Sequence, residues 1–124
     1  IVAMDMQQGM LDKIKRKADK LNLDNIHYLN AKLEDDNNQL EDNRYDRVLL
    51  VTVLGEIPNQ ESAFQAIYKT LKPGGLLSVT EIIFDPHFQR QKTVLMLAQK
   101  QGFLQQAVFG NYIAYTMHLQ KPLN

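Results

Sequence analysis

The sequence predicts an α/β fold in which a mostly parallel sheet lies between two layers of helices. Strand-like apolar runs alternate with segments of helical periodicity along most of the chain, and such alternation is typical of parallel sheets. The run from Leu76 to Ile83 is almost free of polar residues, as expected of a strand covered on both faces. A Gly-Asn pair between the last two runs predicts that the sheet ends in an antiparallel hairpin.

Composition excludes several classes of function. The 124 residues suffice for one domain at most, and 14 basic residues balance 14 acidic ones, so we expect neither a nucleic-acid nor a membrane partner. The sequence has no cysteine for a disulfide or a thiolate site, and no apolar run of membrane-spanning length. We therefore expect a cytoplasmic protein. The chain begins at Ile1, already inside an apolar run, so we also expect further residues upstream of it.

The first predicted elements are a strand and a helix. Ile1 to Met4 form a short buried strand that ends at Asp5, and Gln7 to Leu23 have helical periodicity. Five basic residues occupy the polar side of this helix, and we interpret them as solvated because no aromatic residues interleave with them. The opposite side is predicted to be an apolar face, formed by Met10, Leu11, Ile14, Ala18 and Leu21.

Two further strands flank an acid-rich stretch. Ile26 to Ala31 form the second predicted strand and Arg47 to Leu54 the third. Between them, Lys32 to Asp46 carry several carboxylates but lack the fixed spacing and the glycine of a calcium-binding loop. We interpret this stretch as a solvated surface loop and predict no metal site.

The sequence LKPGG marks the central joint of the chain. An amphipathic helix over residues 60 to 72 is stopped by Pro73, which has no amide hydrogen, and the next strand follows at once. Gly74 and Gly75 permit the tight reversal between the two elements, so we predict that at least one of them has a positive φ.

The last part of the chain predicts a helix and the terminal hairpin. A turn at Phe84 to Phe88 precedes a helix from Gln89 to Gln101, and Gly102 is placed to cap its C-terminus. The strands Phe103 to Phe109 and Tyr112 to Gln120 then complete the sheet.

These local sequences, in this order, resemble the class I methyltransferases that use S-adenosylmethionine. LKPGG followed by a strand is the most specific part of the resemblance. Ile1 to Asp5 resemble the second strand of that family, and Leu29 to Ala31 resemble the end of its third strand. Tyr45 to Val48 resemble the start of its fourth strand, and Ala98 to Phe103 the helix end before its sixth. The resemblance implies a Rossmann-like three-layer sandwich.

One element of the family is missing from the sequence. Its first strand, which lies between the second and the fourth, carries a glycine-rich turn that holds the methionine end of the cofactor. No such turn occurs in these residues. We therefore expect residues 1–124 to be a partial methyltransferase domain, from its second strand to its last, incomplete at the N-terminus and inactive alone.

The resemblance also implies where the cofactor binds. Asp5 would bind the ribose hydroxyls, Met6 would lie against the adenine, and Asn30 and Ala31 would end the strand that faces the adenine amine. Val51 is a further cofactor-binding position. An acid at the carboxyl end of a parallel strand fits ribose binding on chemical grounds too. The alternative for Asp5 is a purely structural N-cap of the following helix.

A catalytic residue is not required by methyl transfer, which is a direct displacement that depends on alignment and exclusion of water. A base would assist a hydroxyl or amine acceptor, and the candidates near the expected strand ends are Glu56, Glu81 and His87. Many members of the family have a histidine where this chain has Gly55 and Glu56, so we do not expect a histidine-dependent mechanism at that turn.

The sequence thus predicts an S-adenosylmethionine-dependent methyltransferase with a small-molecule acceptor. Two alternatives of other classes stay open. One is a non-catalytic Rossmann-like module that binds a partner, and the other is a nucleotide-binding enzyme on the same fold, such as an aminopropyl transferase. A dehydrogenase is disfavoured, because LKPGG has no special meaning in that class. A homodimer is also left open.

Overall fold

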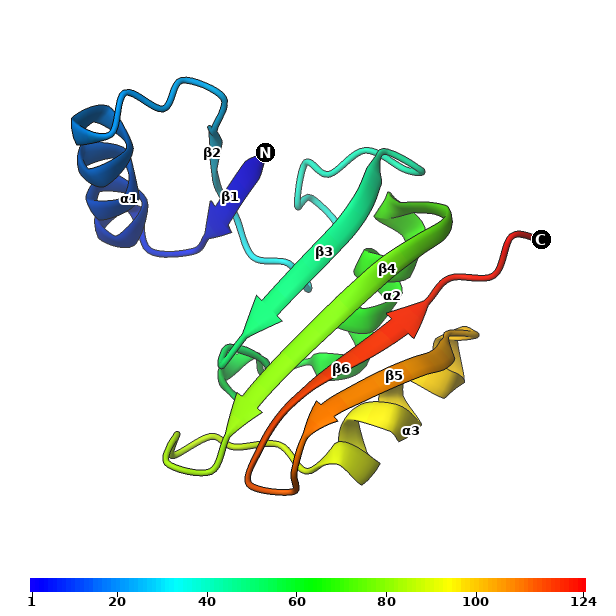
Figure 1. The fold of residues 1–124 in the computed structure, drawn as a ribbon. Coiled ribbons are helices and arrows are strands. Elements are labelled where there is room, and N and C mark those ends of the chain that lie inside the picture. Colours follow the sequence, from blue (N-terminus) through cyan, green and yellow to red (C-terminus); the bar gives the residue numbers. More distant parts are fainter. The chain divides into compact units, whose positions relative to one another are not determined.

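The computed structural model describes all 124 residues, which form two compact units, Ile1–Gln39 and Leu40–Asn124 (Figure 1). Each unit has its own sheet, with two strands in the first and four in the second. The predicted order of strands and helices is confirmed from one end of the chain to the other.

The first unit is a strand, a helix and a parallel strand. β1 (Val2–Asp5) pairs with β2 (His27–Asn30) in a register that sets Val2 against His27 and Asp5 against Asn30. α1 (Gln8–Lys20) connects the two strands. β1 is only half-buried along its length, so the prediction of a buried strand is wrong for this unit. A sheet of two strands beside one helix has too little structure to cover both of its faces.

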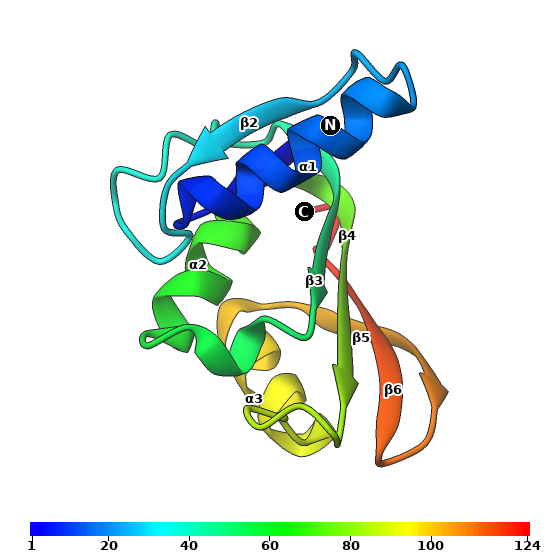
Figure 2. The same ribbon diagram turned by 90° about the vertical axis from the view of Figure 1, so that its left-hand side faces the viewer.

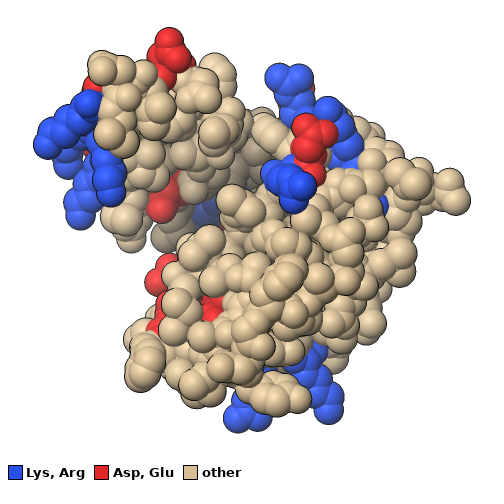
Figure 3. Space-filling model, viewed as in Figure 1, with Lys and Arg blue, Asp and Glu red and all other residues tan.

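The apolar face predicted for α1 is buried only along its centre. Leu11 and Ala18, seven residues apart, are buried, whereas Met10, Ile14 and Leu21 stay exposed on either side of that line. A single small sheet covers only a narrow stripe of a helix. The basic residues of α1 are exposed, as predicted, and Figure 3 shows Lys and Arg gathered along this helix.

The second unit holds a mixed sheet in the order β3-β4-β6-β5. β3 (Tyr45–Val51) runs parallel to β4 (Leu71–Ile82), whereas β6 (Ala114–Gln120) is antiparallel to both β4 and β5 (Leu104–Gly110). The antiparallel hairpin predicted at the C-terminus is therefore confirmed. Its turn is closed by the side chain of Asn111, whose Oδ1 accepts the N–H groups of Ile113 and Ala114.

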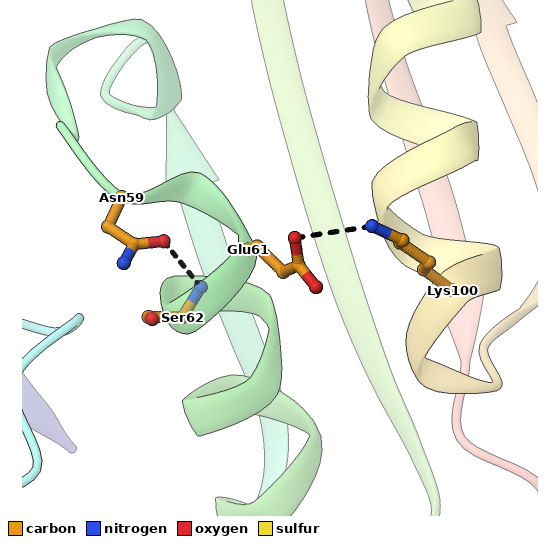
Figure 4. A network of polar contacts seen from close by, with 4 residues as sticks. All are labelled: Asn59, Glu61, Ser62 and Lys100. Atoms are coloured by element: carbon orange, nitrogen blue, oxygen red, sulfur yellow. Dashed lines mark hydrogen bonds and ion pairs between the residues drawn. The ribbon is translucent and has the colours of Figure 1, made fainter.

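Two helices lie on the same face of this sheet, as Figure 2 shows for α2 (Gln60–Thr70) and α3 (Gln91–Gln101). The side chain of Asn59 caps α2 by accepting the N–H of Ser62 at 3.1 Å, and Lys100 of α3 forms an ion pair with Glu61 of α2 at 3.3 Å (Figure 4). The core of the unit consists of fully buried side chains from the helices and strands: Phe64, Ile67, Leu77, Val79, Val94, Phe103, Met117 and Leu119.

The LKPGG joint has the predicted backbone but a different boundary. α2 ends at Thr70, and Leu71 already pairs with Tyr45, after which the ladder resumes at Leu76. The predicted helix to residue 72 is thus too long, because a residue before proline disfavours the helical conformation. Gly74 has a φ of 82°, which confirms the expected positive angle.

The third strand also ends earlier than predicted. It stops at Val51 rather than Leu54, because Thr52 has a φ of 52° and leaves the extended conformation. Leu54 instead begins a short 3-10 helix, η1 (Leu54–Glu56). Gly102 caps α3 in the left-handed conformation with a φ of 103°, as predicted.

Candidate functional site

Three of the predicted cofactor-binding residues lie together in the first unit. Asp5 and Asn30 end neighbouring parallel strands and are paired in register. The side-chain amide of Asn30 donates to the backbone carbonyl of Asp5 at 3.1 Å, and the N–H of Ala31 donates to the same oxygen at 3.2 Å. The two strand ends are thereby fixed to each other, and their side chains share the carboxyl edge of the sheet.

The carboxylate of Asp5 is half-exposed and only partly used within the chain. Its Oδ1 accepts the N–H of Gln7 at 2.8 Å, whereas its Oδ2 has no hydrogen-bond partner. The N-cap of α1 is Gln7, so the alternative interpretation of Asp5 as the N-cap does not describe this structure. A carboxylate held in place through one oxygen and open at the other is suited to accept hydrogen bonds from a polyhydroxyl ligand such as a ribose.

The other two predicted cofactor positions are both exposed apolar residues. Met6 follows Asp5 directly and is 59% exposed, so it does not serve the core of the first unit. Val51 ends β3 in the second unit and is 55% exposed. Both side chains are accessible to a ligand, and their role in binding one stays a prediction.

A second set of predicted residues gathers at the carboxyl end of β4. Glu81 belongs to this strand, Glu56 to η1, and His87 to the turn that follows β4. Gly55 brings η1 and this turn into contact, because a Cβ at that position would overlap the backbone carbonyl of His87. The structure therefore joins the regions of Glu56 and His87, and both of these side chains are exposed.

Glu81 differs from the other two candidates because it is buried, with 1% of its surface exposed. Its Oε1 accepts the N–H of Gln89 at 3.1 Å. Burial raises the pKa of Glu81, the N–H of Gln89 opposes that shift, and the charge of Asp85 adds to it. Tyr115 lies opposite Glu81 across β4 and β6, and burial together with the Glu81 charge raises the pKa of its hydroxyl.

Neither Gln89 nor Tyr115 is among the site residues predicted from the sequence. The hydroxyl of Tyr115 donates to the backbone carbonyl of Gln89, so Glu81 and Tyr115 bind the same residue from two strands. The only sequence signal for this arrangement is a lone glutamate in an apolar strand. Its partner becomes visible only with the strand register.

A hollow of about 440 Å³ opens at the opposite end of the second sheet. It is lined in part by Asp46, Arg47 and Lys72, and the Lys72 ammonium lies 3.3 Å from the Asp46 carboxylate. This hollow contains none of the predicted site residues, since those of the second unit stand where β3 and β4 end. None of the helices is long and apolar enough to cross a membrane.

Comparison with known sequences gives a family match and two curated relatives. Residues 1–79 match the methyltransferase domain family. The ubiquinone/menaquinone biosynthesis C-methyltransferase UbiE of Haemophilus ducreyi is 33% identical over 90 residues, which cover 69% of this chain and 34% of that protein. Phosphoethanolamine N-methyltransferase 2 of Caenorhabditis elegans is 38% identical over 66 residues, covering 53% of this chain and 15% of that protein. The match thus spans about a third or less of either relative.

Comparison with solved structures identifies the same fold. A SAM-dependent methyltransferase from Aquifex aeolicus superposes with a TM-score of 0.84 at 16% identity. The superposition covers 96% of this chain and 67% of that one. The α/β, Rossmann-like fold is therefore shared, in a chain that is shorter than its structural neighbour.

Proposed function

Because this chain belongs to the methyltransferase domain family, whose cofactor is S-adenosylmethionine, we propose that it supplies the ribose- and adenine-binding part of a methyl-transfer site for a small-molecule acceptor. The observation that carries this proposal is the Asp5 carboxylate. It stands at the end of a parallel strand, beside Asn30, with one oxygen committed to the backbone and the other open. That arrangement matches the paired hydroxyls of a ribose.

Asp5 and Asn30 divide the recognition of the nucleoside between them. The open oxygen of Asp5 accepts hydrogen bonds from ribose hydroxyls. The side-chain N–H of Asn30 donates to the backbone carbonyl of Asp5. The side-chain oxygen of Asn30 can therefore accept a hydrogen bond from an exocyclic amine. Met6 offers an exposed, polarisable side chain to an aromatic ring. The cofactor, when bound, supplies an electrophilic methyl group on a positively charged sulfur.

Glu56 and His87 are the candidates for handling a proton of the acceptor. Both are exposed where β4 ends, and neither side chain is bound to another group of the chain. Each can therefore accept a proton from a hydroxyl or an amine that loses it on methylation. The two curated relatives are named for transfer to carbon and to nitrogen, so the proposal specifies a small molecule and leaves the methylated element open.

We further propose that residues 1–124 alone do not bind the cofactor. β1 pairs only with β2 and β3 only with β4, so β1 and β3 each have one unpaired edge. Unpaired backbone groups at a sheet edge are costly when buried, at about 1 to 3 kcal/mol each. The chain also lacks a Gly-x-Gly turn that could hold the methionine end of the cofactor. A non-catalytic module that binds a partner is the alternative function.

Calorimetry with S-adenosylhomocysteine on the complete protein tests the proposal. Asp5→Ala is expected to weaken binding by about 1.5 to 3 kcal/mol, because a charged acceptor is lost from the ribose. Asp24→Ala is the matched control, since Asp24 is exposed and makes no hydrogen bond through its side chain. A loss below about 0.5 kcal/mol for Asp5→Ala would contradict the assignment. Absence of binding by the complete parent protein would favour the non-catalytic module.

A further inference from the structure

Residues 83–90, called here the 83–90 loop, run from the end of β4 to the start of α3. Both ends of the loop are hydrogen-bonded to the sheet or its hairpin. Near its start, the N–H of Ile83 donates to the carbonyl of Ile113 at 2.7 Å. Near its end, Gln89 donates its N–H to Glu81 and accepts from Tyr115 through its carbonyl. The loop is therefore anchored rather than free.

The second anchor is unusual because it uses two buried polar side chains. Glu81 and Tyr115 are directly opposed on β4 and β6, and they are 1% and 3% exposed. The ring of Phe88 packs edge-on against the ring of Tyr115, with centroids 6.2 Å apart, which shields the pair further. A buried carboxylate is costly unless hydrogen bonds compensate it, so packing alone would favour an apolar side chain at this position. The N–H of Gln89 supplies part of that compensation.

Gln89, the residue that Glu81 and Tyr115 bind, also positions His87. The side-chain amide of Gln89 donates to the backbone carbonyl of His87 at 3.0 Å, and the N–H of His87 donates to Asp85 at 2.8 Å. The same His87 carbonyl lies against Gly55, where no Cβ would fit. A chain of contacts thus runs from Glu81 and Tyr115 through Gln89 and His87 to η1.

We propose that Glu81 and Tyr115 are positioning residues that hold the 83–90 loop against η1, so that the exposed side chains of Glu56 and His87 stand at fixed places near the carboxyl end of β4. The assignment of these two side chains to the acceptor rests on the proposed function. The anchoring itself rests on the hydrogen bonds and burial of the chain's own residues. Glu81 then acts through Gln89 and not as a base.

Amide hydrogen exchange of the complete protein, resolved by residue in NMR spectra, tests the anchoring. In Glu81→Leu the Gln89 amide loses its acceptor, and its exchange is expected to rise about tenfold. In Glu81→Gln a side-chain carbonyl still accepts from Gln89, so exchange is expected to stay within about twofold of the parent. In Tyr115→Phe the loss of the hydroxyl is expected to accelerate exchange about threefold.

Tyr112→Phe is the matched control, because Tyr112 lies in the same hairpin with its side chain exposed and its hydroxyl unpartnered. Its exchange pattern is expected to equal the parent's. Unchanged Gln89 exchange in Tyr115→Phe would overturn the proposal. Equal acceleration in Glu81→Gln and Glu81→Leu would also overturn it, since the acceptor oxygen would then not be what holds the loop.

Calorimetry with S-adenosylhomocysteine on the same variants separates this proposal from the proposed function. The anchoring predicts unchanged affinity in Tyr115→Phe, because the predicted cofactor contacts include neither Tyr115 nor Gln89. If the parent fails to bind S-adenosylhomocysteine, the proposed function fails while the exchange data still decide the anchor. If the parent binds S-adenosylhomocysteine but the amide exchange of Gln89 is the same in all variants, only the proposed anchoring of the 83–90 loop is wrong.

Discussion

Asp5 and Glu81 both stand where a β-strand of this chain ends or nearly ends, yet their environments are opposite. Asp5 is half-exposed and keeps one oxygen open, whereas Glu81 is buried and accepts a backbone N–H. The difference comes from the segments that follow. Two residues separate β1 from α1, and only the N–H of Gln7 binds the Asp5 carboxylate, whereas β4 is followed by a loop that turns back to bind and bury Glu81. A strand-end carboxylate is therefore available to a ligand only when the following segment leaves it exposed.

The largest effect is expected at the contact between Gly55 of η1 and His87 of the 83–90 loop, near the buried Glu81. Gly55→Ala would place a Cβ on the His87 carbonyl, so the loop or η1 must move, and we expect a loss of about 2 to 3 kcal/mol in the free energy of unfolding. Gly9→Ala is the control, because Gly9 lies in α1 with open space around it and is expected to stabilise by about 0.5 to 1 kcal/mol. Denaturant unfolding measures both. Equal effects at the two positions would show that the contact at Gly55 is not tight.

The buried state of Glu81 predicts a specific dependence of stability on pH. Its pKa in the folded state is raised above the ordinary value of 4.5, chiefly by burial, so the folded state binds this proton more tightly than the unfolded state does. The contribution to stability is fully present below pH 4.5 and is lost as the pH rises through the raised pKa. Glu81→Gln removes this titration. The stability of the variant relative to the parent should therefore increase from acidic to neutral pH.

Urea unfolding of the parent and of Glu81→Gln over that range measures the effect, with Asp85→Asn as a second variant. Asp85 raises the pKa of Glu81, so its neutralisation should lessen the difference between the parent and Glu81→Gln. Parallel pH profiles for the parent and Glu81→Gln would mean that Glu81 titrates in the folded state as it does when unfolded.

The smallest effect is expected from the ion pair between Glu61 and Lys100, which joins α2 to α3. Both side chains are largely exposed, and such pairs contribute about 0.2 to 1 kcal/mol. A double-mutant cycle with Glu61→Ala and Lys100→Ala should give a coupling at the lower end of that range, decreasing with added salt. A coupling above about 2 kcal/mol would indicate that the helix layer depends on this pair more than its exposure suggests.

Much of the fold could be predicted because its signals are local. Pro73 cannot continue a helix and Gly74 adopts a positive φ through backbone properties of these two residues alone, and Gly102 caps α3 because glycine tolerates the left-handed conformation. The antiparallel terminal hairpin follows from two apolar runs of strand length that a Gly-Asn pair separates, and the position of Asp5 at a strand end follows from the apolar run before it. The resemblance to class I methyltransferases rests on these same local sequences, and the family match confirms it.

Other features depend on residues that are far apart in the sequence. Thr52 ends β3 inside an apolar run that would otherwise continue, and its left-handed backbone has no local sequence signal. Met10 and Ile14 have the periodicity of a buried face but lie beside a sheet too narrow to cover them. The sequence by itself therefore determined the order of the elements and the placement of Asp5 at a strand end. Only the tertiary structure decided which of the predicted residues are buried. It buried Glu81 because strand register places Tyr115 opposite it and the loop returns Gln89 to both.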